Sequence, residues 1–264
     1  MVKTPVCWLG LLPLIFAVLI PSCASGPPPG PTPAELAGTA ATTIIIAPFN
    51  VVSSLPPELE GSTKMVSAVL VEYLEAHGKT VAVMGFRAGR DLWKASIQEV
   101  RNSDDKRNFE NAARVYARKI GEQFEFDALI VPSLFIQNAK MSSRTVKWDG
   151  AEQTMEQRGT LGTKYQGLRT SSNVRAASLF IHVLDREGGS VQTSRRGLEL
   201  IQHIEFGTKK RGGYSGTKDP QMNLVDDVPP IQDKDRVRAG IASALFPFLP
   251  EEIPTSPTTS PEAS

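Results

Sequence analysis

The chain has 264 residues with 29 basic and 28 acidic side chains, and 41% of its residues are hydrophobic and 7% aromatic. This composition is typical of a globular protein and excludes a collagen-like, polybasic or wholly disordered chain. The near-zero charge argues against nucleic acid as an obligate partner, because phosphate binding needs a basic surplus or a basic face.

The segment 1–22 predicts an export signal. Lys3 is followed by an apolar stretch from Val6 to Ile20. Its length of about 15 residues suits the core of a signal peptide and falls short of the roughly 20 residues that a membrane-spanning helix needs.

The four residues Ile20-Pro21-Ser22-Cys23 resemble the bacterial lipobox, although Pro21 departs from the small or hydroxyl residues that are commonest at its position. The resemblance implies that Cys23 carries a diacylglycerol on its thiol, that cleavage occurs just before it, and that its new amino group is acylated. Each buried methylene of such chains contributes about 0.8 kcal/mol, so the attachment is expected to be permanent. A plain secretory signal and a simple transmembrane anchor are the alternatives.

Removal of residues 1–22 takes away Lys3 and Cys7, which leaves 28 basic and 28 acidic side chains and Cys23 as the single cysteine. With that thiol acylated, no disulfide can form. Ala24 and Ser25 follow the cysteine, without an aspartate. By resemblance to enterobacterial sorting rules, this favours the outer membrane with the domain facing the periplasm; the cell surface is the alternative.

Proline-rich segments are expected at both ends of the mature chain. Residues 23–41 predict a tether, because Gly26–Pro33 read GPPPGPTP and cannot build a core. In the polyproline conformation this tether would reach roughly 50 Å at about 3.1 Å per residue. Residues 251–264 predict a disordered Ser/Thr/Pro tail. Between them, residues 42–250 are predicted to form a single α/β domain with a flexible loop near 205–233.

The first half of this domain predicts alternating strands and helices. Continuous apolar runs are typical of strands buried on both faces, namely Thr43–Phe49, Thr80–Phe86 and Asp127–Ile136. Apolar residues at helical spacing predict three helices, Ser62–Ala76, Asp91–Val100 and Asp104–Phe124. This alternation indicates right-handed βαβ units and a largely parallel sheet.

The second half predicts antiparallel hairpins and a final helix. Asp149-Gly150 lies between alternating flanks and predicts a two-residue hairpin turn. The strands 174–184 and 190–204 would form a second hairpin, and 235–246 reads as a helix. The predicted fold class is therefore α/β, with a mixed sheet in which parallel βαβ units come first, antiparallel hairpins follow, and a terminal helix ends the domain.

No complete catalytic or metal-binding motif is found. His182 and His203 fall in strands predicted to pair, and we expect ordinary strand histidines; a metal pair with Glu205 is the alternative. The segment 213–217 lacks the last glycine of a nucleophile elbow, and Asn50 follows the first strand where a dinucleotide site needs glycines. The sequence thus predicts no enzyme, no cofactor and no metal.

Two features are candidates for partner binding. Trp148 lies beside the Asp149-Gly150 turn, where we expect it to be exposed, and an exposed aromatic is a common anchor for a partner. Lys209, Lys210 and Arg211 form a basic run that could face anionic lipid or cell-wall polymer. Solvated charges are the simpler interpretation of this run.

The order of elements behind a lipobox resembles a group of envelope lipoproteins. It is similar to the α/β domain shared by the curli secretion channel subunit, the lipoprotein activators of penicillin-binding proteins, and the amino-terminal domain of the Tol-Pal translocation protein. The resemblance covers Thr42 to Ile204 and depends on four segments, Ile44–Phe49, Val66–Leu74, Thr80–Phe86 and Phe126–Val131. It implies a non-enzymatic scaffold or regulatory lipoprotein, and no catalytic residues are inherited from it.

Three functional hypotheses follow. The first is an outer-membrane lipoprotein whose domain binds another envelope protein in assembly or maintenance. The second is a periplasmic hydrolase or transferase acting on cell-wall or lipid substrate, with Asp127 and Asp185 in acid–base roles. The third is a homo-oligomeric subunit of a ring-forming secretion assembly, although the segment 140–170 is polar on both faces and disfavours a pore.

Overall fold

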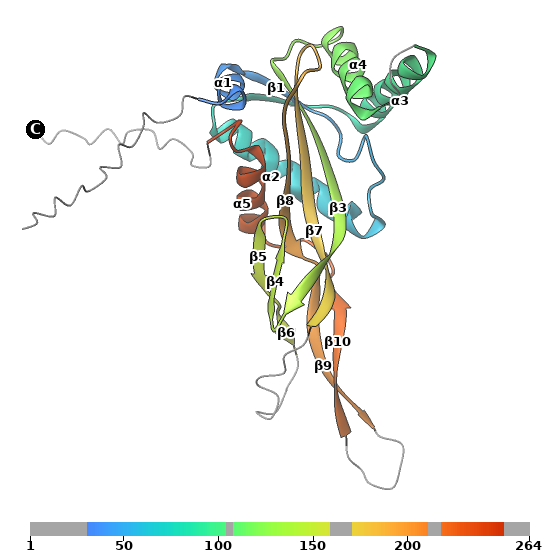
Figure 1. Ribbon diagram of the computed structural model, residues 1–264, viewed down its shortest axis with the longest axis vertical. Helices are drawn as coiled ribbons and strands as arrows, with labels where there is room; N and C mark the ends of the chain where they lie inside the picture. Colours follow the sequence, from blue (N-terminus) through green and yellow to red (C-terminus); the bar gives the residue numbers. More distant parts are fainter. Residues whose placement is uncertain (1–30, 104–107, 159–170, 211–217, 251–264) are drawn as a thin grey trace, which may run out of the picture. The chain divides into compact units, whose positions relative to one another are not determined.

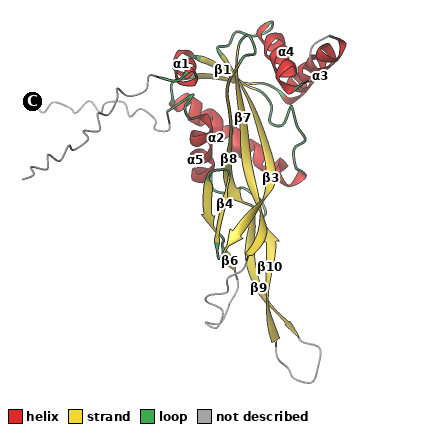
Figure 2. Ribbon diagram, viewed as in Figure 1, coloured by secondary structure: helices red, strands yellow, loops and turns green. Residues whose placement is uncertain are grey.

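The computed structural model describes residues 31–103, 108–158, 171–210 and 218–250 (Figure 1). A mixed sheet with helices on both faces confirms the predicted α/β class (Figure 2). The helices are α1 (Pro33–Ala40), the 3₁₀ helix η1 (Pro57–Ser62), α2 (Thr63–Ala76), α3 (Phe86–Asn102), α4 (Phe109–Gly121) and α5 (Lys234–Leu245). The strands are β1 (Thr43–Ile46), β2 (Thr80–Val83), β3 (Ala128–Ser142), β4 (Thr145–Trp148), β5 (Ala151–Thr154), β6 (Gln157–Arg158), β7 (Ser171–Asp185), β8 (Ser190–Leu200), β9 (Gln202–Lys210) and β10 (Lys218–Asp226).

The parallel part of the sheet has β1 at its centre, between β2 and β3. The chain crosses from β1 to β2 in one direction and from β2 to β3 in the other, so right-handed crossovers put α2 on one face and α3 with α4 on the opposite face. Side chains alternate accordingly. Ile44 and Ile46 pack toward α2 and α5, whereas Ile45 packs toward α3 and α4.

The antiparallel part follows as predicted. β3 and β7 pair along their full length, and β8 pairs with β7. The β4–β5 turn has positive φ at both central residues, 41° at Asp149 and 75° at Gly150, which is the type I′ geometry that an Asp-Gly pair favours. The terminal helix α5 starts at the N-cap Asp233, whose side chain accepts hydrogen bonds from the backbone amides of Asp235 and Arg236.

A helix replaces part of the predicted tether. Pro33–Ala40 forms α1, so the expectation of an extended chain over 23–41 is wrong for these residues. Thr32 and Glu35 make a reciprocal capping box, a signal that outweighs the Pro/Gly composition just before it. The Lys79 ammonium then donates to the carbonyls of Gly38 and Ala41, at 2.8 and 2.7 Å. The helix is therefore fixed to the body of the domain.

β2 is an exposed edge strand and is not buried on both faces as predicted. It pairs with β1 alone, and Val83 is 53% exposed. The apolar run also stops short of Phe86, which begins α3 and is 58% exposed. Periodicity cannot distinguish a central strand from an edge strand, because both can carry continuous apolar residues.

The predicted flexible loop near 205–233 is largely a hairpin. β9 and β10 pair antiparallel in register from Gln202↔Asp226 to Lys210↔Lys218. At its base, Ile204 is buried and Phe206 and Leu224 are partly buried against the core between β3, β4, β7 and β8. These apolar side chains attach the hairpin to the core, although the Gly, Lys and Pro content of the segment predicted a loop.

Candidate functional site

Most residues predicted to bind a partner or lipid lie where the structure gives no side-chain geometry. Cys23 and Arg211 are outside the described residues. Lys209 and Lys210 fall in the distal part of β9, where their backbones pair with Asp219 and Lys218. Among the helices of the described ranges, none is long and apolar enough to span a bilayer.

Trp148 is buried, and the expectation that it is exposed is wrong. Its side chain is 6% exposed and packs with Met141, Val146 and neighbouring apolar residues beneath the β4–β5 turn. The indole Nε1–H donates to the backbone carbonyl of Ala177 at 3.1 Å. A β-carbon on Gly197 would lie 2.5 Å from this nitrogen, so β8 closes over the ring. Trp148 is therefore a core residue. The predicted contact with a partner depended on its exposure, and this side chain is not exposed.

A buried asparagine lies at the crevice that often binds nucleotides in α/β folds. In this sheet the crevice lies at the carboxyl ends of β1 and β3, because the chain crosses to β2 on one side of β1 and then to β3 on the other side. Asn50, 7% exposed with φ of 56°, donates to the carbonyl of Leu134 at 2.8 Å and accepts from its amide at 2.9 Å. The side chain thus replaces a strand neighbour for β3, and this explains why an asparagine follows β1 where a nucleotide site has glycines.

The two carboxylates proposed for acid–base work hold backbone groups in place. Asp127 Oδ2 accepts from the amides of Thr42 and Thr43 and from the Thr42 hydroxyl, each at 2.8 Å. These hydrogen bonds, led by the Thr43 amide, lower the pKa of Asp127. Asp185 accepts from the amide of Gly189 at 2.6 Å and closes the β7–β8 turn. Both arrangements fit structural roles at strand ends.

The two strand histidines belong to separate clusters. His182 on β7 pairs with Thr193 of β8, whereas His203 lies on β9 and pairs with Val225 of β10. The predicted hairpin of 174–184 with 190–204 is confirmed for β7 and β8, but β8 ends at Leu200, before His203. His203 Nδ1 lies 2.9 Å from a carboxylate oxygen of Asp227. Within the described ranges, no group of three or more His, Cys, Asp or Glu side chains is arranged to hold a metal ion.

The burial of His182 predicts that the folded domain loses stability as the pH falls. It is 4% exposed, its Nε2 lies 2.9 Å from the Ser190 hydroxyl, and its ring packs on Phe109. Burial lowers the pKa of His182, and the nearby charge of Glu110 only partly opposes this. The unfolded chain therefore takes up the proton more readily, so the contribution of His182 is complete above its unfolded pKa and is lost as the pH falls. Urea unfolding should show that the free energy of unfolding falls more between pH 7.5 and pH 5.0 for the wild type than for His182→Gln. Equal decreases for the two proteins would contradict this.

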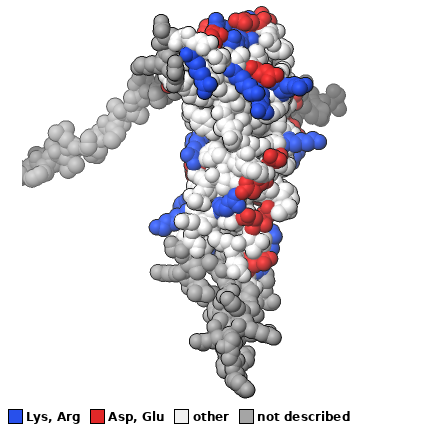
Figure 3. Space-filling model, turned by 90° about the vertical axis from the view of Figure 1, so that its right-hand side faces the viewer, with Lys and Arg blue, Asp and Glu red and all other residues white. Residues whose placement is uncertain are grey.

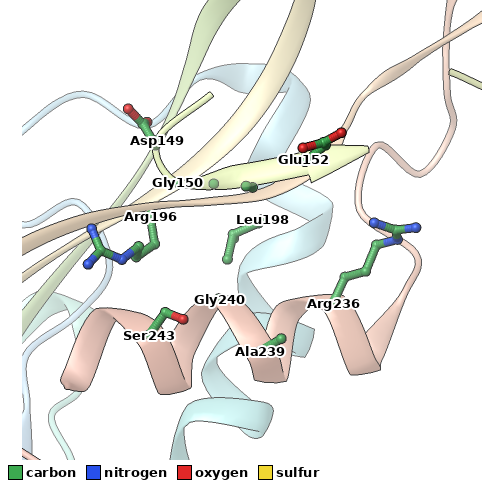
Figure 4. A pocket seen from close by; sticks show the side chains of 11 residues that line it. Asp149, Gly150, Glu152, Arg196, Leu198, Arg236, Ala239, Gly240 and Ser243 are labelled. Atoms are coloured by element: carbon green, nitrogen blue, oxygen red, sulfur yellow. The ribbon is translucent and has the colours of Figure 1, made fainter. Parts of the chain in front are cut away.

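A cavity of about 200 Å³ lies between α5, β8 and the β4–β5 turn (Figure 4). Arg196 and Arg236 stand at its two ends, and Asp149 and Glu152 also line it. The two cations and two carboxylates cancel in formal charge, so the lining has no net preference for an anion. It is a less distinctive candidate than the surface formed by β2 and α3.

The candidate docking surface, termed the β2–α3 surface, is defined by Val83, Phe86, Arg87, Arg90 and Lys94. All five side chains are exposed, and a hollow of about 380 Å³ is lined by the last four together with one acidic residue of α3. The cations recur at helical spacing and share one face of α3. Within the described residues they form no ion pair, in contrast to Arg118 and Lys119 of α4, which bind Glu99. Figure 3 shows basic and acidic side chains intermixed on the upper part of one face of the molecule.

Sequence reasoning missed this surface because it assigned Phe86 to a buried strand and began the helix at Asp91. The signal that could have found it is Gly85-Phe86, a strand end followed directly by Arg87 and Arg90 at helical spacing. No protein-family model matches the sequence, and a search of curated proteins finds no match. The interpretation of the site therefore depends on its own residues.

Proposed function

We propose that this protein is a lipid-anchored lipoprotein of the bacterial outer membrane, whose α/β domain is a non-enzymatic binding module for another component of the cell envelope. The domain faces the periplasm and serves assembly or maintenance of the envelope. The lipobox-like segment that ends at Cys23 supports the anchor. The resemblance of the element order to scaffold and regulatory lipoproteins supports the class of function.

The β2–α3 surface is the observation that carries the binding role. It places an exposed valine at the end of an edge strand, Val83, three residues before the exposed Phe86 and the three cations of α3. These cations form no ion pair among the described residues, although Asp91 lines the same hollow. Exposed apolar groups rimmed by charges are typical of protein interaction sites. The carboxylates Asp127 and Asp185 meanwhile hold backbone amides, which favours binding over catalysis.

The position of α1 limits how far the domain can stand from the lipid. Because α1 is fixed by Lys79, only the residues 24–32 separate the anchor at Cys23 from the folded domain. In the polyproline conformation these residues would span about 28 Å at about 3.1 Å each. This reach is shorter than the 50 Å expected for an unstructured tether, so α1 is expected to stay closer to the membrane than that tether would allow.

Photocrosslinking in intact cells tests this function. A photoreactive phenylalanine analogue at position 86 should form an adduct with one envelope protein, because this side chain is 58% exposed within the β2–α3 surface. The matched control is position 124, another exposed phenylalanine outside that surface, where we expect no such adduct. Folded, membrane-bound protein that gives no protein adduct at position 86 would overturn the proposal.

A further inference from the structure

The free edge of β2 presents unpaired backbone groups. The amides of Thr80 and Met84 donate to the carbonyls of Thr42 and Ile46 on the β1 side, at 2.8 and 2.9 Å. Because backbone groups alternate in direction along a strand, Val81 and Val83 direct their amides and carbonyls away from β1. Among the described residues no strand, helix or loop supplies a partner for this edge.

The opposite edge of the sheet is protected. There the amide of Gly197 in β8 donates to the carbonyl of Asp149 at 3.0 Å, and the amide of Leu200 donates to Gln153 Oε1 at 2.9 Å. Proteins also protect edges with lysine or proline, and β2, with the sequence TVAV, contains neither. An open edge rich in valine is a template for the addition of another strand.

Cations that follow this edge strand in the chain indicate the kind of segment that it would bind. Arg87, Arg90 and Lys94 follow β2 in the chain, and Asp91 is the single acidic side chain that lines their hollow. An incoming segment with Asp or Glu residues would balance the remaining positive charge. In a two-fold pairing of β2 edges, which is antiparallel, the cations of the two copies would lie at opposite ends of the paired strands. A second copy would therefore bring no acidic segment to these cations. A membrane surface could attract the cations but would leave the backbone groups of Val81 and Val83 unpaired.

We propose that the β2–α3 surface binds its partner by strand addition: an extended acidic segment of another envelope protein pairs with the free edge of β2 and places carboxylates against Arg87, Arg90 and Lys94. This inference rests on the proposed binding function and names its mode. Backbone hydrogen bonds would supply affinity, and the carboxylates would fix the register of the segment.

A proline substitution tests the strand pairing. Val83→Pro removes the outward amide but leaves the hydrogen bonds to β1, because Val83 does not donate to β1. Capture from the photoreactive position 86 should fall about tenfold or more, the loss expected when one interfacial hydrogen bond disappears and its acceptor is left unpaired. Val83→Ala keeps the amide and should retain most of the capture. An unchanged unfolding midpoint of Val83→Pro would show that the domain is intact.

A charge reversal tests the acidic partner. Arg87→Glu combined with Arg90→Glu should lose the capture, whereas Lys64→Glu on α2, an exposed cation outside the surface, should keep it. Mass spectrometry of the adduct should find an Asp/Glu-rich segment. Capture that survives Val83→Pro overturns strand addition, and capture that survives the charge reversal, or an adduct with lipid or with a second copy, overturns the acidic segment. These outcomes leave the binding function standing, whereas absence of any protein adduct in the wild type overturns both.

Discussion

Replacement of Cys23 with alanine is expected to abolish fatty-acid labelling of the protein completely. The thiol is the acceptor for diacylglycerol in the lipobox interpretation, and Cys23 is the only cysteine that follows the leader. Because lipid transfer precedes cleavage in that pathway, the variant should also keep residues 1–22. Metabolic labelling with palmitate and the mobility of the protein on a gel measure both effects.

Two matched versions make this result specific. Cys7→Ala alters the other cysteine, which lies within the predicted leader, and should keep full labelling. Cys23→Ala behind a leader that is cleaved without lipid should release the domain into the soluble fraction, because the acyl chains supply the attachment. Retention of the second version in the membrane would contradict the lipid anchor.

Trp148→Ala is expected to lower the free energy of unfolding by about 3–5 kcal/mol, the range measured for the truncation of large buried aromatic side chains. The ring is 6% exposed and fills the core beneath the β4–β5 turn. Its removal would leave a cavity and take away the hydrogen bond to the carbonyl of Ala177. Urea unfolding of the soluble domain, followed by circular dichroism, measures the change.

Trp148→Phe is the control for the ring. It keeps an aromatic ring and loses the indole donor, so its cost should be closer to the roughly 1 kcal/mol of one hydrogen bond. A loss well below 1 kcal/mol for Trp148→Ala would mean that this side chain is exposed, as its place beside a hairpin turn predicted. Partner capture by Trp148→Phe should be compared with capture by the wild type, because this variant is expected to stay folded.

The fold was predictable where local patterns and tertiary structure agree. Ile44 to Ile46 are apolar on both faces because helices cover both sides of β1, and Asp149-Gly150 prefers the positive φ angles that its turn requires. Where local composition and tertiary contacts disagree, the prediction was wrong. The Thr32–Glu35 capping box nucleates α1 just after a Pro/Gly run, and Ile204 fixes a hairpin base within a polar stretch.

The candidate site was harder to predict than the fold because exposure is a tertiary property. The sequence of β2 does not indicate whether this strand has one neighbouring strand, as the structure shows, or two. Phe86 reads as the end of an apolar run, yet it begins α3 and points into solvent. Trp148 shows the reverse error, since β8 closes over a side chain that a turn would otherwise expose.

The mass of the amino-terminal peptide of the mature protein, extracted from membranes and measured by mass spectrometry, tests the lipid-anchored domain most directly. The expected peptide begins at Cys23 and carries a diacylglycerol and an amide-linked acyl chain. A peptide that begins elsewhere, or one with an unmodified Cys23, would contradict the lipid anchor.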